Sequence, residues 1–149
     1  MRSEPAADAT RWTRVRAVVN AVNGSTALGL LVARAGGATP RRQGRGVLLA
    51  TGHRWGFPRA DAFTVGNVVI SRRDAAWWTG RETLLRHEDR HCTQYAWSLG
   101  PVMLPLYGAA AAVSWVLAGD HASYNPFERL AGLDDGGYRA ARLRRARRR

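Results

Sequence analysis

The chain has 149 residues, 46% of them hydrophobic, which is enough for one domain with an ordinary core. Its single cysteine, Cys92, excludes an intramolecular disulfide and a metal site built from several cysteines. The formal net charge is +12, and the chain contains arginine but no lysine. This charge favours contact with polyanions. An arginine-only composition rich in alanine and glycine is also typical of a GC-rich genome, so no specific nucleic-acid partner is predicted.

The first 12 residues are small and polar and are predicted to be disordered, and one domain is expected over residues 13–138. No signal peptide is indicated, because the first apolar run starts only near Val15. That run predicts a helix to about Val22, a break at Asn-Gly-Ser-Thr, and a second short element ending near Arg34. Polar residues make the run a poor membrane span. A cytoplasmic protein is therefore expected, with membrane association as the alternative.

Residues 36–46 are rich in glycine and arginine and are predicted to form a loop. Strands are predicted at 46–51 and 62–71, because both segments are rich in β-branched residues and are bounded by Gly, Pro or charged residues. Trp55 and Phe57 lie between them. These two side chains could border a substrate groove or cover the sheet, and we favour the cover.

A helix is predicted over about residues 80–99, because this segment has an apolar side and a helix stop at Gly100 and Pro101. Its middle contains an HExxH motif made by His87, Glu88 and His91. Histidines four residues apart project from one face of a helix, so both can bind one Zn²⁺, and the glutamate between them can act as general base on a metal-activated water. The alternative is that both histidines are surface residues of a charged helix.

The twenty residues from Leu99 to Ala118 carry no formal charge, which makes them a transmembrane candidate by length. Pro101 and Pro105 break the first third, leaving a helix from about residue 103. A single span would place the two histidines and everything after Gly119 on opposite sides of a membrane. We therefore predict a buried helix that packs against the HExxH helix.

A catalytic zinc site takes three protein ligands. Glu128 is the preferred third ligand because it opens a helix far enough along the chain to fold back, and His121 is the runner-up. Alternatively, Asn125 and Glu128 form a capping box that needs no metal. Gln94 shares a face with His91 and could hydrogen-bond a ligand or substrate. Three tyrosines are candidate oxyanion donors: Tyr95, Tyr124 and Tyr138.

The order of strand, HExxH helix and downstream glutamate resembles zincin peptidases over about half of the chain. The E-x-x-A spacing of Glu128 and Ala131 resembles minimal gluzincins, the zincin branch with a glutamate as third ligand. The chain lacks the longer histidine motif of metzincins, and Gly132 stands where thermolysin-like enzymes have an aspartate. No specific family is assigned.

The resemblance implies an α+β zincin-like domain, with a short sheet before the active helix and Zn²⁺ bound by His87, His91 and Glu128. It also implies that a sheet edge pairs with an extended peptide or protein substrate. The expected function is zinc-dependent hydrolysis of amide bonds, with Glu88 as the general base. Two alternatives are a non-catalytic metal-binding or structural protein of this shape, and a small basic protein that binds nucleic acid or a membrane surface.

Residues Arg139 to Arg149 include seven arginines and one large apolar side chain. A segment of this composition is typical of a solvated chain end. We predict a disordered tail with weak affinity for polyanions or an anionic membrane surface.

Overall fold

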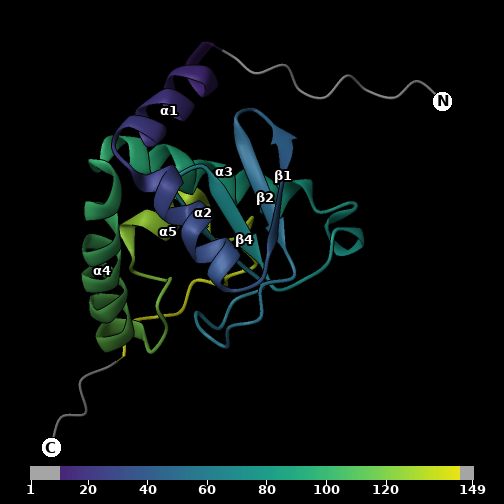
Figure 1. Cartoon of the computed structure of the whole chain (residues 1–149). Coiled ribbons are helices and arrows are strands. Elements are labelled where there is room, and N and C mark those ends of the chain that lie inside the picture. The colour runs from purple at the N-terminus through teal and green to yellow at the C-terminus, as the bar shows by residue number, and fades with distance from the viewer. Residues whose placement is uncertain (1–10, 145–149) are drawn as a thin grey trace, which may run out of the picture.

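The computed structural model describes residues 11–144, which form a four-stranded mixed sheet with helices packed around it (Figure 1). The expected α+β class is confirmed. The strand order is β1-β2-β4-β3, with β2 and β4 parallel and the two outer pairs antiparallel. The strands are β1 (Thr39–Gly44), β2 (Val47–Thr51), β3 (Ala62–Val65) and β4 (Val68–Ser71).

The helices are α1 (Arg11–Val22), α2 (Ser25–Ala35), α3 (Glu82–Trp97), α4 (Met103–Ala118) and α5 (Pro126–Ala131), with short 3₁₀ turns at Ala76–Trp78 and Gly100–Val102. The predicted break between the first two helices is confirmed. Gly24 adopts a φ of 82° there, and Oδ1 of Asn23 accepts a hydrogen bond from the backbone N–H of Ser25 at 3.0 Å.

The start of α1 corrects the expected disorder of the first 12 residues, because Arg11 and Trp12 are already helical. Residues 1–10 of that segment lie outside the described residues.

The predicted loop at residues 36–46 is wrong, because it contains the edge strand β1. This strand pairs with β2 from Thr39 opposite Thr51 to Gly44 opposite Val47. It is almost wholly exposed, so it shows no apolar alternation that would mark it as a strand. Arginines on an exposed edge also hinder pairing with another chain.

The single strand predicted at residues 62–71 is a hairpin of β3 and β4, joined at Gly66 and Asn67. Gly66 has a φ of 64°, and a Cβ atom there would lie 2.5 Å from the backbone of Ser25. A glycine is therefore required for both the turn and the close approach of α2.

Apolar residues cover both faces of the sheet. On one face, α2 packs against a cluster that includes Ala50, Val68 and Ile70. On the other, Cys92 of α3 and Trp78 pack against a cluster that includes Val69. All four residues of β4 are buried, which explains why this central strand reads as a continuous apolar run.

Polar contacts between α1 and α3 set the rotation of the helix that carries the motif. Nη2 of Arg16, whose side chain is 1% exposed, lies 2.7 Å from Oδ1 of Asp89, and Nη1 donates to the Asp89 carbonyl at 3.0 Å. Nδ2 of Asn20 donates to the Cys92 carbonyl at 2.8 Å. Asp89 lies two residues from His87, so these contacts hold the side of α3 opposite the histidine.

The prediction that the apolar helix after α3 is buried is wrong. Among the described residues of α4, only Met103 and Ser114 are buried, whereas Trp115 is 57% and Val116 is 73% exposed. The helix forms the left-hand edge of the molecule in Figure 1, and it packs against α5 and the 3₁₀ turn Gly100–Val102. By length and composition, Gly100–Ala118 is a candidate membrane span.

Part of the predicted disordered tail has defined contacts. The backbone N–H of Arg144 donates to the Leu117 carbonyl at 2.7 Å, and that of Ala141 donates to Oγ of Ser123 at 2.7 Å. Arg144 therefore lies against the last turn of α4, and Ala141 lies against the loop that follows this helix. Residues 145–149 of the tail lie outside the described residues.

Candidate metal centre

The HExxH motif lies in the middle of α3, and its three functional side chains point into the protein. His87, Glu88 and His91 are 2%, 4% and 6% exposed. The two histidines are therefore not surface residues of a charged helix. Burying three ionisable side chains costs free energy unless each has a partner or a metal.

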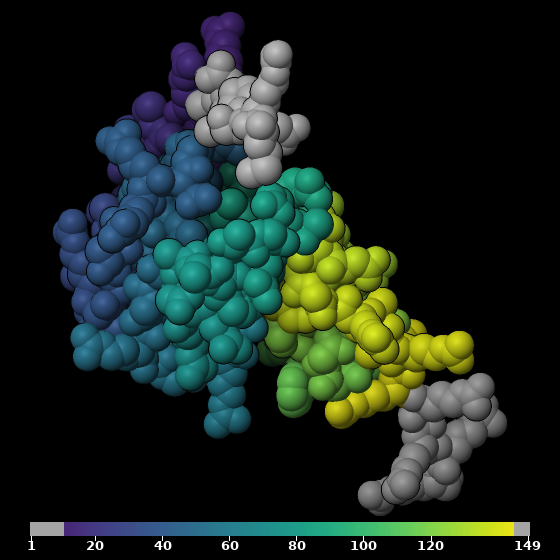
Figure 2. All heavy atoms as spheres, turned by 90° about the vertical axis from the view of Figure 1, so that its right-hand side faces the viewer, coloured from purple at the N-terminus to yellow at the C-terminus, as the bar shows by residue number. Residues whose placement is uncertain are grey.

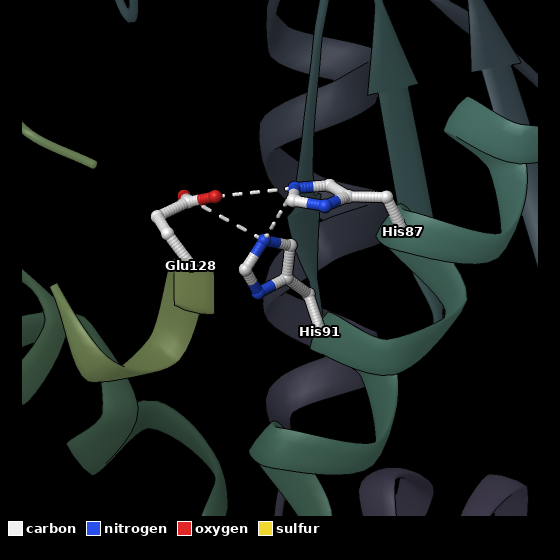
Figure 3. A group of neighbouring side chains, drawn as sticks. All are labelled: His87, His91 and Glu128. Atoms are coloured by element: carbon white, nitrogen blue, oxygen red, sulfur yellow. Dashed lines mark hydrogen bonds and ion pairs between the residues drawn. The ribbon is translucent and has the colours of Figure 1, made fainter. Parts of the chain in front are cut away.

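The carboxylate of Glu128 on α5 meets both histidines (Figure 3). Its Oε2 lies 3.1 Å from Nε2 of His87, its Oε1 lies 3.6 Å from Nε2 of His91, and the two Nε2 atoms are 3.1 Å apart. One ligand atom from each residue lies within 4.8 Å of the others. These three residues could hold a metal ion.

The distance between the two histidine nitrogens is close to the distance that a shared zinc ion requires. Two nitrogen ligands at about 2.05 Å from Zn²⁺, with a tetrahedral angle between them, would be about 3.3 Å apart. The observed separation of 3.1 Å between Nε2 of His87 and Nε2 of His91 is close to that value. No rearrangement of the backbone is needed to bring the ligands into range.

Hydrogen bonds at the far side of each ring leave both Nε2 atoms free to bind a cation. Nδ1 of His87 is 2.9 Å from the Gly132 carbonyl, which can only accept, so this nitrogen carries the proton. Nδ1 of His91 is 2.7 Å from Oε1 of Gln94, whose amide nitrogen donates to the Phe127 carbonyl at 2.8 Å. Such partners orient metal-binding histidines and fix their tautomer.

Without a cation, three lone-pair-bearing groups would face one another. Oε2 of Glu128 accepts no hydrogen bond from the described residues. Burial lowers the pKa of His91, but hydrogen bonding and attraction from Glu128, with attraction from Glu88, outweigh it and raise that pKa above its usual value. Burial raises the pKa of Glu128, but its contacts with His87 and His91 outweigh burial and hold that pKa well below its usual range. The pocket thus favours positive charge, as a proton or as a metal ion.

The capping alternative for Glu128 is not realised. Oδ1 of Asn125 caps α5 by accepting from the backbone N–H of Phe127 at 3.0 Å, while the N–H of Asn125 donates to the Ala122 carbonyl. The Glu128 side chain instead accepts a short hydrogen bond from the hydroxyl of Tyr107 on α4. Asn125 therefore caps α5, and the Glu128 side chain faces the histidines instead of the helix end.

Glu88 is held by the edge strand of the sheet. Oγ1 of Thr64 on β3 donates to Oε2 of Glu88 at 2.6 Å. Thr64 does not bond the other carboxylate oxygen of Glu88, Oε1. Glu88 lines the same cavity as the three candidate ligands, with a volume of about 700 Å³.

The walls of this cavity are mainly apolar. They include Phe63 of β3, Tyr95 of α3 and Leu104 of α4. Trp55 and Phe57 also line the cavity and remain largely exposed, so the expected covering of the sheet by these two side chains is wrong. They border a groove, which was the other reading of the segment.

The remaining candidate residues lie at different distances from this centre. His121 is exposed and stacks edge-on against Tyr138, with ring centroids 5.2 Å apart, and it is not one of the three converging ligands. Tyr138 lies beside His87, with ring centroids 6.0 Å apart. Tyr95 lines the apolar wall, whereas the Tyr124 ring lies under Arg129, outside the residues that line the cavity.

Other acidic side chains near the motif have structural partners. Oδ2 of Asp135 accepts from Nη1 of Arg90 at 2.7 Å. Asp120 accepts from the backbone N–H groups of Ala122 and Ser123.

In Figure 2 the segment after α5 (yellow) lies directly against the segment around the start of α3 (teal). This packing brings Gly132 to His87.

Several contributors were missed from the sequence, and one of them is Thr64, which donates to Glu88. Tyr107 lies four residues after Met103 on the inward stripe of α4, and a hydroxyl in an otherwise apolar helix was the available signal. Gly132 supplies the carbonyl for His87. A Cβ atom on Gly136 would lie 2.5 Å from the His87 ring, so a glycine is needed for the close approach. The sequence held no local signal for either glycine.

The chain matches no family model, no curated protein and no solved structure.

Proposed function

We propose that the protein is a zinc-dependent hydrolase of amide bonds, a minimal gluzincin-like peptidase. The observation that carries the proposal is the convergence of Nε2 of His87, Nε2 of His91 and the Glu128 carboxylate, with the opposite ring nitrogens already engaged. Two imidazoles and one carboxylate form a donor set typical of catalytic zinc. A zinc ion held by these three residues would keep one coordination position for a reactant.

When bound, Zn²⁺ supplies a Lewis acid that polarises a carbonyl oxygen and lowers the pKa of water toward about 7. Glu88 accepts one proton as the water oxygen forms its bond to the carbonyl carbon. Glu88 then gives this proton to the amide nitrogen as the carbon–nitrogen bond breaks, which releases an acid and an amine. Thr64 holds the other carboxylate oxygen and so orients Glu88 for both transfers.

Tyr138 is the preferred oxyanion donor among the three tyrosines. It lines the cavity together with Glu88 and His87, and burial, followed by the charges of Glu128 and Glu88, raises the pKa of its hydroxyl. The hydroxyl therefore stays protonated at neutral pH and can donate to a developing negative charge.

The edge strand and the apolar cavity support an extended peptide substrate with a large apolar side chain. β3 is an outer strand of the sheet and adjoins Glu88 through Thr64. An edge strand can pair with an added peptide strand. The cavity beside it offers aromatic and aliphatic walls for the side chain of the residue at the cleavage site.

Metal analysis of the purified protein tests the centre. Wild type is expected to bind one zinc per chain, and His87→Ala and Glu128→Gln are expected to lose it. His121→Ala is the matched control, because it removes a nearby imidazole that does not converge on the centre. Zinc retained in His87→Ala, or lost equally in His121→Ala, would refute the proposed ligand set.

Glu88→Gln tests hydrolysis separately from metal binding. This variant should keep its zinc, and cleavage of a mixed library of peptides should fall by a factor of about 100 to 10,000, the usual contribution of a general base. The second candidate, a non-catalytic metal protein, is favoured if wild type binds zinc yet cleaves no more of the library than Glu88→Gln.

A further inference from the structure

An apolar helix lies on the surface of this protein with most of its circumference uncovered. The inward stripe of α4 contains the buried Met103 and Ser114 and the half-buried Tyr107, Ala110, Ala111 and Ala118, and the remaining residues of the helix are exposed. A helix that is apolar all round is normally buried in a protein core or in lipid. The large apolar side chains exposed on α4 are Leu104, Leu106, Val113, Trp115, Val116 and Leu117.

The uncovered surface continues beyond the N-terminal end of α4. Leu99 and Val102, in the turn before the helix, are exposed, and so is Val22 at the end of α1. A Cβ atom on Gly100 would touch the side chain of Asn23, so the end of α1 adjoins this turn. We call the exposed apolar residues of α4, together with Leu99, Val102 and Val22, the α4 face.

Tryptophan and arginine flank the α4 face. At one end, the exposed rings of Trp12 and Trp97 stack with centroids 5.8 Å apart, and Arg11 and Arg14 are exposed on the same first turn of α1. At the other end, Arg144 is hydrogen-bonded to the last turn of α4. Tryptophan favours the boundary between lipid and water, and arginine favours anionic headgroups.

Charge decides between lipid and a second copy of this chain. The chain carries a net charge of +12, and no charged side chain lies between Arg90 and Asp120 to offset the arginines at the ends of the face. Two copies that met through the α4 face would bring like charges together. An anionic bilayer supplies both an apolar phase for the face and negative charge for its arginines.

We propose that the α4 face binds the surface of a membrane that contains anionic phospholipids, with α4 lying along the interface. The helix does not cross the bilayer, because Glu128, which follows it, lies 3.1 Å from His87, which precedes it. This proposal is independent of the proposed hydrolysis. It concerns where the protein binds and would hold for an inactive protein.

Binding of the full chain to vesicles tests the proposal. Wild type should co-sediment with phosphatidylcholine vesicles that contain phosphatidylglycerol, and less with phosphatidylcholine alone or at high salt. The variant Val113→Glu/Val116→Glu places two carboxylates on the α4 face. Its affinity for the anionic vesicles should fall by about tenfold for each valine removed from lipid contact.

The matched control is Thr39→Glu/Gln43→Glu. It makes the same change in net charge on the exposed edge strand β1, on the side of the molecule away from α4 (Figure 1). This control should bind anionic vesicles nearly as wild type does. Equal losses in the two double variants would show that net charge alone drives binding and would overturn the assignment to the α4 face.

A second measurement avoids substitutions that add charge. Val116→Cys and Gln43→Cys can each be labelled with an environment-sensitive fluorophore, because Cys92 is buried and burial raises the pKa of its thiol. Anionic vesicles should shift the label at position 116 toward the emission seen in an apolar medium and leave the label at 43 unchanged. No shift at 116, or a shift at 116 caused by protein concentration alone through dimer formation, would refute the proposal.

Discussion

Helices α3 and α4 are both 16 residues long, but the polar helix α3 is the more buried of the two and the apolar helix α4 is the more exposed. α3 carries the charged motif, and its buried residues include His87, Glu88 and His91. α4 carries no charged side chain and is mostly exposed. In this small domain, a helix face is buried where another element supplies complementary side chains, and hydrophobicity alone does not decide it.

Four polar side chains of α3 that point into the domain have partners on other elements. Asp89 has Arg16 from α1, Glu88 has Thr64 from β3, and the histidines have Glu128 from α5. By contrast, only one side of α4 packs against the rest of the domain.

The largest effect is expected from Arg16→Met. Asp89 is mostly buried, and without Arg16 its charge would lose its closest partner, at 2.7 Å. Breaking one partner of a buried ion pair typically costs about 3–5 kcal/mol. Urea denaturation should show this loss in the free energy of unfolding. Arg73→Met is the control, since the exposed pair of Arg73 and Asp61 should cost less than about 1 kcal/mol. Similar losses in both variants would show that the buried pair has no special weight.

Removal of zinc should come next in size. Zinc at 100 times its dissociation constant stabilises a protein that binds it only when folded by about 2.7 kcal/mol. Thermal unfolding with zinc and with a chelator should differ accordingly, because the ion would link α3 to α5. His87→Ala should show no such difference. A zinc-dependent shift that persists in His87→Ala would place the ion elsewhere.

Gln94→Ala should weaken zinc binding without removing a ligand. Gln94 holds Nδ1 of His91 at 2.7 Å and reaches the Phe127 carbonyl on α5. Loss of such an orienting partner typically lowers metal affinity by a factor of about 10 to 100. Competition with a chromophoric chelator measures the change. Thr83→Ala, on the exposed side of the same helix, should leave the affinity unaltered; an equal loss there would indicate a general effect on α3.

The smallest effect is expected for Val116→Ser in α4. This side chain is exposed, so its removal should change the free energy of unfolding by no more than about 0.5 kcal/mol. Met103→Ala, on the inward stripe of the same helix, should cost about 2–5 kcal/mol. If Val116→Ser proved as costly as Met103→Ala in the isolated protein, the exposed position of α4 would be contradicted.

Local sequence determined the helices and the geometry within them. The break at Gly24 followed from backbone preferences, and the spacing of His87 and His91 placed both rings on one face of α3 because a helix repeats every 3.6 residues. The strand in the glycine- and arginine-rich segment was missed, because an exposed edge strand carries no alternation of apolar and polar residues.

Tertiary structure decided everything that depends on two distant segments meeting. From the sequence, Glu128 was preferred as the third ligand but could also have capped α5, and only the packing of α5 against α3 decided between the two. Tyr107 and Gly132 joined the centre in the same way. The exposure of α4 could not be predicted from its sequence either. An apolar segment favours an apolar environment, but its sequence does not show whether the protein itself provides that environment.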